Sequence, residues 1–298
     1  MTPRAFLAKA TLSLLAVCAL MASCSDDVEV GVNESQLGSG AAAGAGAQPT
    51  ECTKTTCQGH IYACGDCIDN DDDGTVDAFD FECLGPCDAT EDFFYSGIPG
   101  QNNAPCRQDC YFDQDTGPGN DRCYWDHRCD ELSTEPGYPP SGDARCRYDP
   151  SAQVSGSSES CETLAGAQAP ECLESCLPLV PNGCDCFGCC ELPAGTGRFV
   201  WIGSTQNGSG SCDAASAGNL ELCKPCTQVQ GCLNPCGACE VCVGRPATDV
   251  RNCADAGPGD AGERARCPIG RAACGQHGEP PCTGGSYCIT GCCVPIPT

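Results

Sequence analysis

Cysteine constrains this chain more than any other feature of its sequence. The 298 residues include 34 cysteines, a density that is typical of exported proteins held together by disulfides. Glutathione and thioredoxin keep cytosolic thiols reduced, and cytosolic chains therefore rarely carry so many cysteines. The count predicts a disulfide-linked fold that matures in an oxidising compartment.

The remaining composition predicts a fold without a large core. Aromatic residues make up 6% of the chain, whereas Gly and Pro number 37 and 23. No apolar period of 3.6 residues is sustained over the length of a helix, and strand and helix patterns do not alternate. We expect a small disulfide-rich fold that is mostly loop, with short β-strands and a few short helices. The best candidates are a strand over residues 198–203 and a helix over residues 171–177.

Residues 1–23 have the pattern of a secretory signal peptide. Arg4 and Lys9 supply positive charge around the start of an apolar stretch over residues 10–22. A helix over that stretch rises only about 20 Å, which is short for a hydrocarbon core of about 30 Å. The segment therefore predicts export followed by removal, and not a permanent membrane span.

The end of this segment favours lipid attachment at Cys24. Cleavage just before Cys24 would place Met21 three residues ahead of the cut, where signal peptidase prefers a small residue. Cleavage one residue earlier would place Leu20 there. The run Met-Ala-Ser-Cys at residues 21–24 instead resembles the bacterial lipobox, with Met21 where Leu is usual. The resemblance implies a thioether-linked diacylglycerol on Cys24, which would hold the protein on a membrane at the periplasmic face or the cell surface.

The parity of the cysteines supports the same assignment. Loss of Cys18 with the signal peptide and use of Cys24 for lipid leave 34 − 2 = 32 cysteines, which can close 16 disulfides. Ordinary cleavage ahead of Cys24 would leave 33 cysteines and one orphan thiol. The even count favours the lipoprotein.

The mature chain is predicted to contain a tether, three cysteine-rich modules and a linker. Residues 24–50 are rich in acidic, Gly and Ala residues, as flexible tethers are. The modules span residues 51–161, 162–253 and 267–298, and residues 254–266 link the last two. Their twelve, fourteen and six cysteines are even numbers, so that each module could be closed internally.

One acidic loop has the spacing of a calcium site. Calcium loops of twelve residues take their ligands from positions 1, 3, 5, 7, 9 and 12 and turn sharply at position 6. A loop that begins at Asp69 places Gly74 at position 6. Its six ligand positions are held by Asp69, Asp71, Asp73, Thr75, Asp77 and Asp80. The sequence therefore predicts a Ca²⁺ site at these six residues, the alternative being a solvated acidic turn without metal.

The crowding of charge in this loop explains why a cation is expected. Carboxylates so close together repel one another, and a hard cation that prefers oxygen ligands relieves the repulsion. Mg²⁺ fits less well because it keeps several of its waters. Asp80 stands at position 12, where helix–loop–helix sites carry Glu, and in this respect the loop resembles dockerin and thrombospondin type-3 repeats. Cysteines on both sides of the loop are expected to hold its ends through disulfides.

Two cysteine clusters allow an alternative interpretation as zinc or iron–sulfur ligands. They are Cys184-x-Cys186-x2-Cys189-Cys190 and Cys236-x2-Cys239-x2-Cys242. Behind a signal peptide, disulfides are favoured over metal. In the last module, adjacent Cys292 and Cys293 are expected to take different partners, because a bridge between neighbours strains the peptide between them.

The other side chains with chemical potential form no recognisable catalytic constellation. His60, His127 and His277 are far apart, lack the spacing of a metal or nucleophile site, and are expected at the surface. Trp125 and Trp201 are expected to pack in the interior. The formal charge of −25 argues against nucleic acid as a partner, because phosphates require Lys and Arg.

Three segments, residues 67–88, 181–190 and 287–293, resemble a family of uncharacterised cysteine-rich exported bacterial proteins and lipoproteins with a DxDxDGxxDxxD metal-binding motif. The first segment also resembles the metal-binding repeat of copper-associated surface proteins, C-D-G-x-D-N-D-C-D-G-x-V-D. Cys67 and Asp72 replace that repeat's Gly and inner Cys. Loss of the inner Cys favours a hard ion over copper.

Taken together, these patterns favour an exported, lipid-anchored surface protein that acts as a binding or structural module and not as an enzyme. Its expected partners are the membrane, through the lipid, and a surface protein, a glycan or a matrix component. The alternative is an extracytoplasmic hydrolase or inhibitor whose site is assembled from residues scattered along the sequence.

Overall fold

The computed structural model describes most of the cysteine-rich body. The described residues are 52–96, 102–103, 106–113, 121–132, 146–154, 156–237, 240–245, 267, 270–274 and 282–296. All of them belong to one compact unit. The predicted signal peptide, Cys24, the tether and the linker over residues 254–266 lie outside the described residues.

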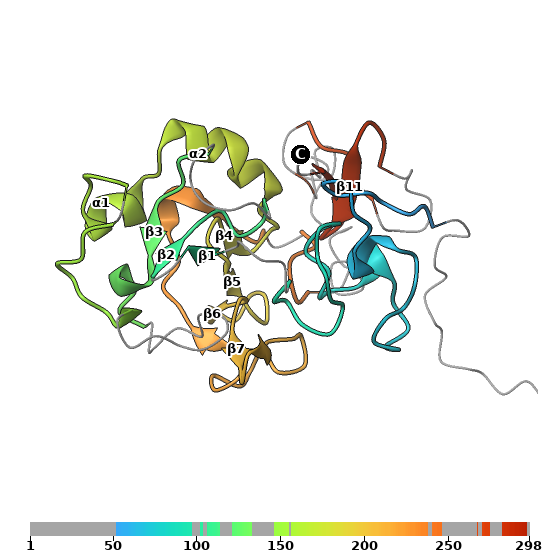
Figure 1. Ribbon diagram of the computed structural model, residues 1–298, viewed down its shortest axis with the longest axis horizontal. Helices are drawn as coiled ribbons and strands as arrows, with labels where there is room; N and C mark the ends of the chain where they lie inside the picture. The colour runs from blue at the N-terminus through green and yellow to red at the C-terminus, as the bar shows by residue number, and fades with distance from the viewer. Residues whose placement is uncertain are drawn as a thin grey trace, which may run out of the picture. The chain divides into compact units, whose positions relative to one another are not determined.

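The described chain is mostly loop with short elements, as predicted (Figure 1). Its helices are α1 (Cys161–Gly166) and α2 (Pro170–Ser175), with 3-10 turns η1 (Ala63–Gly65), η2 (Asp77–Phe79), η3 (His127–Cys129), η5 (Leu177–Leu179) and η6 (Gln230–Cys232). The strands up to residue 201 are β1 (Asn102–Asn103), β2 (Arg107–Gln108), β3 (Trp125–Asp126), β4 (Cys184–Asp185), β5 (Cys189–Glu191) and β6 (Phe199–Trp201). The later strands are β7 (Thr205–Gln206), β8 (Ser209–Gly210), β9 (Lys224–Pro225), β10 (Leu233–Asn234), β11 (Ser286–Ile289) and β12 (Cys292–Pro295).

The largest sheet has five antiparallel strands in the order β10-β4-β5-β6-β9. Its third and fourth strands pair Cys189 with Trp201 and Cys190 with Val200. β6 lies inside the strand predicted over residues 198–203. A three-stranded sheet has the order β1-β2-β3, and two-stranded sheets pair β7 with β8 and β11 with β12.

The two helices begin at residues that suit helix starts. The Ser160 hydroxyl accepts a hydrogen bond from the Thr163 amide at 3.2 Å and thereby caps α1. Pro170 opens α2, where its missing N–H costs nothing. α2 forms most of the helix predicted over residues 171–177, and η5 begins at the last of these residues. In Figure 1, α1 lies beside strand β3.

Fifteen disulfides cross-link the described residues and use 30 of the 32 cysteines beyond Cys24. The other two, Cys239 and Cys253, lie outside the described residues. Cys292 and Cys293 bond to Cys267 and Cys282, so the prediction that they do not bond to each other is confirmed.

Two of these bridges cross the boundary expected after residue 161. Cys110 pairs with Cys176, and Cys123 pairs with Cys172. The first and second modules are therefore not closed separately, because segments that are distant in sequence fold against one another and bring these cysteines together. The six cysteines of the last module pair only among themselves.

Disulfides replace much of the apolar core. The main buried cluster contains 27 residues, of which ten are half-cystines. Its largest fully buried side chains include Tyr111, Phe94, Phe187 and Ile202. A small apolar interior of this kind stabilises a chain much less than a full core does, and covalent links that restrict the unfolded chain supply the difference.

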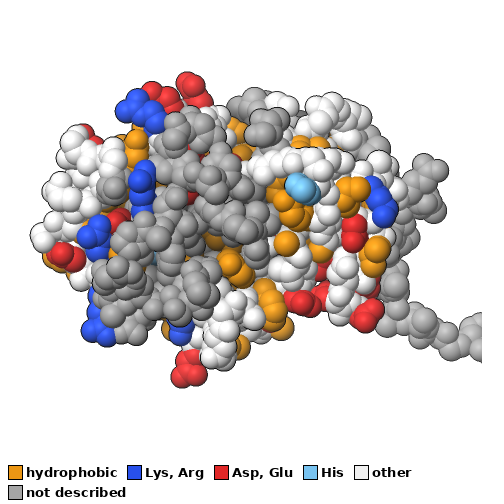
Figure 2. All heavy atoms as spheres, in the orientation of Figure 1, with side chains coloured by type: hydrophobic (Ala, Val, Ile, Leu, Met, Phe, Trp, Pro, Cys, Tyr) orange, Lys and Arg blue, Asp and Glu red, His pale blue; other side chains and the backbone are white. Residues whose placement is uncertain are grey.

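Among the described residues, few large apolar side chains are exposed. On the face shown in Figure 2, hydrophobic side chains are scattered in small patches among polar and charged ones. The exposed ones include Ile61, Ile68, Leu132 and Leu220, which are 45% to 53% exposed. Within the described residues, no helix has the length and apolar character needed to cross a bilayer.

Candidate metal centre

Disulfides hold both ends of the predicted calcium loop. Cys67, just before the loop, bonds to Cys52, and Cys64 bonds to Cys83 just after it. A third bridge joins Cys57 to Cys87. The sequence predicted this arrangement, in which covalent links take the place of the two flanking helices of a helix–loop–helix site.

Side chains within the loop fold it into consecutive turns. Asp69 Oδ2 accepts from the Gly74 amide at 3.0 Å, and Asp71 Oδ1 accepts from the Asp73 amide at 3.1 Å. Asp73 Oδ1 accepts from the Thr75 amide at 2.7 Å. Gly74 has φ +95°, a conformation that favours glycine and allows the sharp turn expected at position 6. The aspartates therefore shape the loop before any ion is considered.

Four of the predicted ligands share one electrostatic neighbourhood. Burial raises the pKa of Asp71, and the negative charges of Asp73 and Asp69 raise it further. Burial also raises the pKa of Asp80 to about 8, and the neighbouring Glu82 carboxyl and the charge of Asp73 raise it further. Asp71 and Asp80 thus resist ionisation, mainly because they are buried and further because their neighbours are acidic.

Two oxygens at the ends of the loop have no hydrogen-bond partner. Asp69 Oδ1, at position 1, and Asp80 Oδ2, at position 12, are both buried and receive no donor. The Asp80 side chain as a whole is only 4% exposed. Buried carboxylate oxygens are normally hydrogen-bonded, so these two are the atoms in the loop best suited to a cation.

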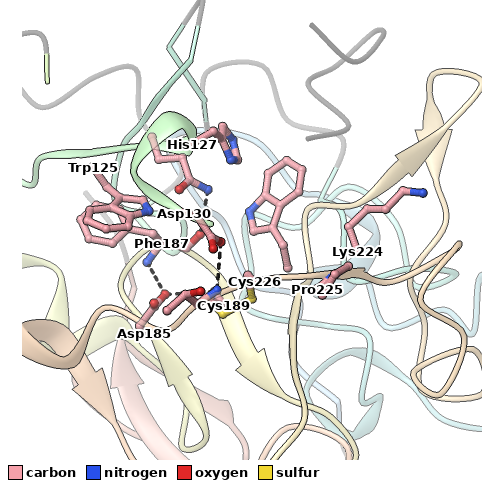
Figure 3. Close-up of a pocket in the computed structure, with 12 residues that line it drawn as sticks. Trp125, His127, Asp130, Asp185, Phe187, Cys189, Lys224, Pro225 and Cys226 are labelled. Carbon is pink, nitrogen blue, oxygen red and sulfur yellow. Dashed lines mark hydrogen bonds between the residues drawn. A yellow bond between two sulfur atoms is a disulfide. The ribbon is translucent and has the colours of Figure 1, made fainter. Parts of the chain in front are cut away.

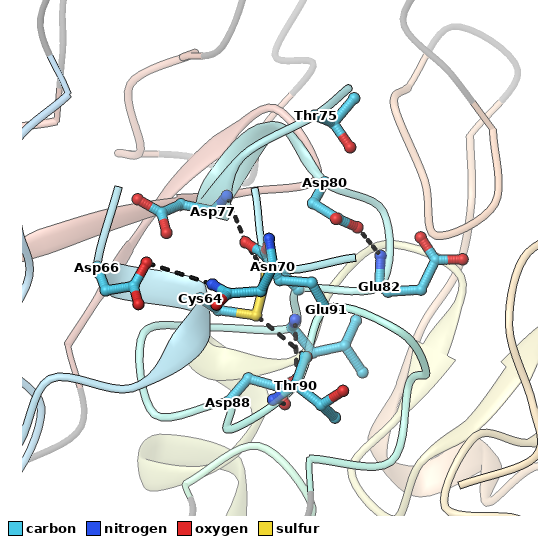
Figure 4. The surroundings of a disulfide bond; sticks show 12 residues. Cys64, Asp66, Asn70, Thr75, Asp77, Asp80, Glu82, Asp88, Thr90 and Glu91 are labelled. Carbon is cyan, nitrogen blue, oxygen red and sulfur yellow. Dashed lines mark hydrogen bonds between the residues drawn. A yellow bond between two sulfur atoms is a disulfide. The ribbon is translucent and has the colours of Figure 1, made fainter. Parts of the chain in front are cut away.

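The structure places Asp77 differently from the other predicted ligands. Its carboxylate accepts from the Cys67 amide, with the shorter distance 3.1 Å at Oδ2. In Figure 4 the Asp77 side chain points away from Thr75 and Asp80. Burial raises its pKa to about 6. Position 9 of a calcium loop often acts through a water, and this orientation is compatible with that role.

Glu91 contributes to the loop from outside it. Its side chain is buried, with Oε2 accepting from the Asn70 amide at 2.7 Å and Oε1 accepting from the Asp77 amide at 2.8 Å. One carboxylate therefore clamps the two halves of the loop, as Figure 4 shows. Burial raises its pKa. No fixed spacing marks Glu91 in the sequence, and only the folded chain reveals it.

The cysteine clusters that allow a metal interpretation are bridged. Cys184 bonds to Cys190, and Cys186 and Cys189 bond to Cys232 and Cys226. The second cluster contains the bridge between Cys236 and Cys242. The preference for disulfides over zinc or iron–sulfur ligation is thus confirmed for these cysteines, while Cys239 lies outside the described residues.

A second group of buried carboxyls lines a pocket around the five-stranded sheet (Figure 3). Asp185, which is fully buried in β4, accepts from the Phe187, Cys189 and Val229 amides at 2.7–2.9 Å. Asp130 accepts from the Leu132 and Thr227 amides, both at 2.9 Å. Burial raises the pKa of Asp130 and raises that of Asp185 to about 7. Both carboxyls are used to hold loops in place.

His127, in the same pocket, corrects the expectation that the histidines lie at the surface. It is 4% exposed and packs edge-on against Trp201, with ring centroids 4.8 Å apart. Burial lowers its pKa to about 3, so the ring is neutral. Trp125 and Trp201 are buried, and Trp125 stacks on Phe187, as expected of packing residues. The burial of His127 could not be predicted from the sequence, because its packing partner Trp201 lies far from it along the chain.

The resemblance to cysteine-rich exported proteins is a prediction from three short segments of sequence. No protein-family model, curated protein or solved structure matches this chain. The candidate site is therefore assigned from its own geometry. It is a disulfide-framed loop of carboxylates, two of whose buried oxygens receive no hydrogen bond.

Proposed function

We propose that this chain is an exported surface protein, anchored through a lipid on Cys24, in which a calcium-binding loop and disulfides maintain a binding or structural module. The observation that carries the calcium assignment is the pair of buried, unpartnered oxygens, Asp69 Oδ1 and Asp80 Oδ2, at the two ends of the loop. The abundance of disulfides indicates an extracytoplasmic protein. The partner that we propose is a surface protein, a glycan or a matrix component.

The charge around the loop supports a divalent cation. Residues 52–96 contain eleven Asp and Glu residues and a single Lys or Arg, which is Lys54. Among the described residues, neither ion pair involves a side chain from this segment. Buried carboxylate oxygens of this segment that lack an amide donor must therefore be neutralised by protons or by a bound cation. A set of ligands that consists only of oxygen atoms favours Ca²⁺ over softer metals.

A structural or binding role is also supported by the second group of carboxyls. Asp130 and Asp185 are bound to backbone amides, an arrangement that fixes loops and leaves little freedom for proton transfer. His127 beside them is held neutral by burial. We therefore propose that the protein acts through binding and not through catalysis.

Calorimetric titration of the oxidised, chelator-treated protein with CaCl₂ tests the calcium assignment. We expect binding in the micromolar-to-millimolar range that is typical of extracellular modules. Asp69→Ala and Asp73→Ala should weaken it strongly, whereas Asp92→Asn, which removes an exposed charge near the loop, should have a small effect. Absence of binding heat for the wild-type protein would contradict the assignment.

Membrane fractionation tests the anchor separately. The full-length chain should partition with membranes and incorporate labelled fatty acid, and Cys24→Ser should be soluble after export or be retained uncleaved. A wild-type protein that is released without label would contradict lipid attachment and leave the calcium assignment intact.

A further inference from the structure

We propose that Glu82 is an additional calcium ligand next to Asp80, and that an ion held by this pair fastens the loop to the turn around Ala214 in the second cysteine-rich module. The proposal rests on the proposed calcium function and adds to it. It adds a ligand that lies outside the twelve-residue motif. It also means that the ion stabilises a contact between the loop and another segment of the chain.

The geometry of Asp80 leaves one oxygen available. Asp80 Oδ1 accepts from the Glu82 amide at 2.7 Å, whereas Oδ2 is buried and receives no donor. Position 12 of a helix–loop–helix site carries a Glu that supplies two oxygens to the ion. Asp80 is shorter and has only one oxygen free of hydrogen bonds. A second carboxylate beside it would restore the missing ligand.

Glu82 is positioned to supply that oxygen. It is 8% exposed, and its amide donates to Asp80 Oδ1, which keeps the two residues side by side. Figure 4 shows the two side chains next to each other after the loop. Glu82 Oε1 accepts from the Ala214 amide at 2.8 Å, so the side chain is held in place from the opposite side. This hydrogen bond uses Oε1 and not Oε2.

Two ionised carboxylates cannot bond to each other directly, because both are acceptors. Their contact requires either a shared proton or a cation between them. Calcium at neutral pH offers the second solution, in which both groups ionise and ligate the metal.

Hydrogen bonds connect the segment that follows the loop to the turn at residues 212–214. The Ala214 amide binds Glu82, and the Phe94 amide donates to the Cys212 carbonyl at 3.0 Å. The Tyr111 hydroxyl donates to the Phe94 carbonyl at 2.9 Å. An ion that fixes Glu82 would therefore stabilise the contact between the loop segment and the turn at residues 212–214.

Calcium titration of the full chain carrying Glu82→Gln tests this role. Glutamine keeps an acceptor for the Ala214 amide but loses the charge, and we expect roughly tenfold weaker calcium binding, since the charge of the ligand set tunes affinity. The matched control Asp92→Asn should change affinity by much less. Equal affinity of wild type and Glu82→Gln would overturn the role of Glu82 while the calcium site stands. No binding by the wild type would overturn the proposed function itself.

Hydrogen exchange of the wild-type protein provides a second test that does not depend on a variant. Saturating CaCl₂ should slow exchange of the Ala214 amide at least severalfold relative to EDTA, because the ion fixes its acceptor. An Ala214 amide that is unaffected by calcium, in a protein whose loop amides do respond, would overturn the proposed link between the two modules.

Discussion

Two regions of this protein bury carboxyl groups, and they do so in different ways. Around the five-stranded sheet, each oxygen of Asp130 and Asp185 accepts at least one backbone amide hydrogen bond. In the loop over residues 69–80, Asp69 and Asp80 each keep one buried oxygen without a donor. The first region satisfies its carboxyls from within the chain, and the second does not.

This difference separates structural carboxyls from those that we propose as calcium ligands. A buried carboxylate surrounded by amides is neutralised in part by their dipoles and serves as a fixed connection between loops. A buried carboxylate with a free oxygen and no basic neighbour is destabilising unless a proton or a cation joins it. The pKa of Asp185 is raised to about 7 and that of Asp80 to about 8, so burial alone does not distinguish the two regions. The two regions are distinguished by the hydrogen bonds that their carboxyls accept.

The largest effect is expected from removing a structural carboxyl. Asp185→Ala leaves three buried amides, those of Phe187, Cys189 and Val229, without an acceptor. Each such loss costs about 1–3 kcal/mol, so we expect a loss of unfolding free energy of about 3 kcal/mol or more. Asp69→Ala in EDTA should cost about 1 kcal/mol or less.

Urea unfolding with the disulfides intact measures both variants. A reversed order, with Asp69→Ala the more destabilising in EDTA, would break the distinction between the two regions.

The next effect is expected from calcium itself. An ion that binds only the folded state stabilises it by about 2.7 kcal/mol at a free concentration one hundred times its dissociation constant. Because the loop has unpartnered oxygens, unfolding free energy should rise by this amount in wild type. In Asp73→Ala it should rise little. An equal rise in both proteins, measured by urea unfolding, would place the stabilising ion elsewhere.

The pH dependence of stability should separate the regions further. The pKa of Asp185 is raised from 3.8 to about 7, so the folded state holds a proton over a range in which the unfolded state has lost it. The contribution of this group to stability is therefore greatest below about pH 4 and is lost as pH rises toward 7, by at most about 1.4 kcal/mol per pH unit. The raised pKa of Asp80 acts in the same direction up to about pH 8.

Calcium should remove the contribution of Asp80, because the ion replaces its proton, and leave that of Asp185. Urea unfolding from pH 4 to 8 in EDTA and in CaCl₂ checks this. Identical slopes between pH 7 and 8 under the two conditions would show that Asp80 does not ligate the ion.

The smallest effect is expected from an exposed ion pair outside both regions. Arg122 and Glu171 are 2.9 Å apart, but their side chains are 58% and 47% exposed. Arg122→Ala should change the unfolding free energy by about 1 kcal/mol or less, because solvent screens such pairs. It should have no effect on calcium binding. A larger loss in urea unfolding would assign this pair a packing role that its exposure does not indicate.

Local pattern and chemistry were sufficient to predict part of the fold. The strand at β6, the helix at α2 and the separate partners of Cys292 and Cys293 all follow from neighbouring residues. The covalent frame of the loop also follows, because its cysteines lie close in sequence. These features depend on interactions across a few tens of residues at most.

Long-range contacts could not be predicted in the same way. The pairing of Cys110 with Cys176 depends on how distant loops pack, and cysteine counts cannot specify it. Glu91 and Glu82 reach the loop through the fold, and a spacing rule built on twelve residues cannot include them. The burial of His127 against Trp201 has the same origin.

Hydrogen exchange measured residue by residue, in EDTA and in saturating CaCl₂, tests the distinction between the two regions most directly. Calcium should slow the amides of the loop over residues 69–80 and leave those of Phe187, Cys189 and Val229 unchanged, because their acceptor Asp185 needs no ion. Loop amides that exchange equally fast under both conditions would contradict the account. So would protection that appears around Asp185 instead.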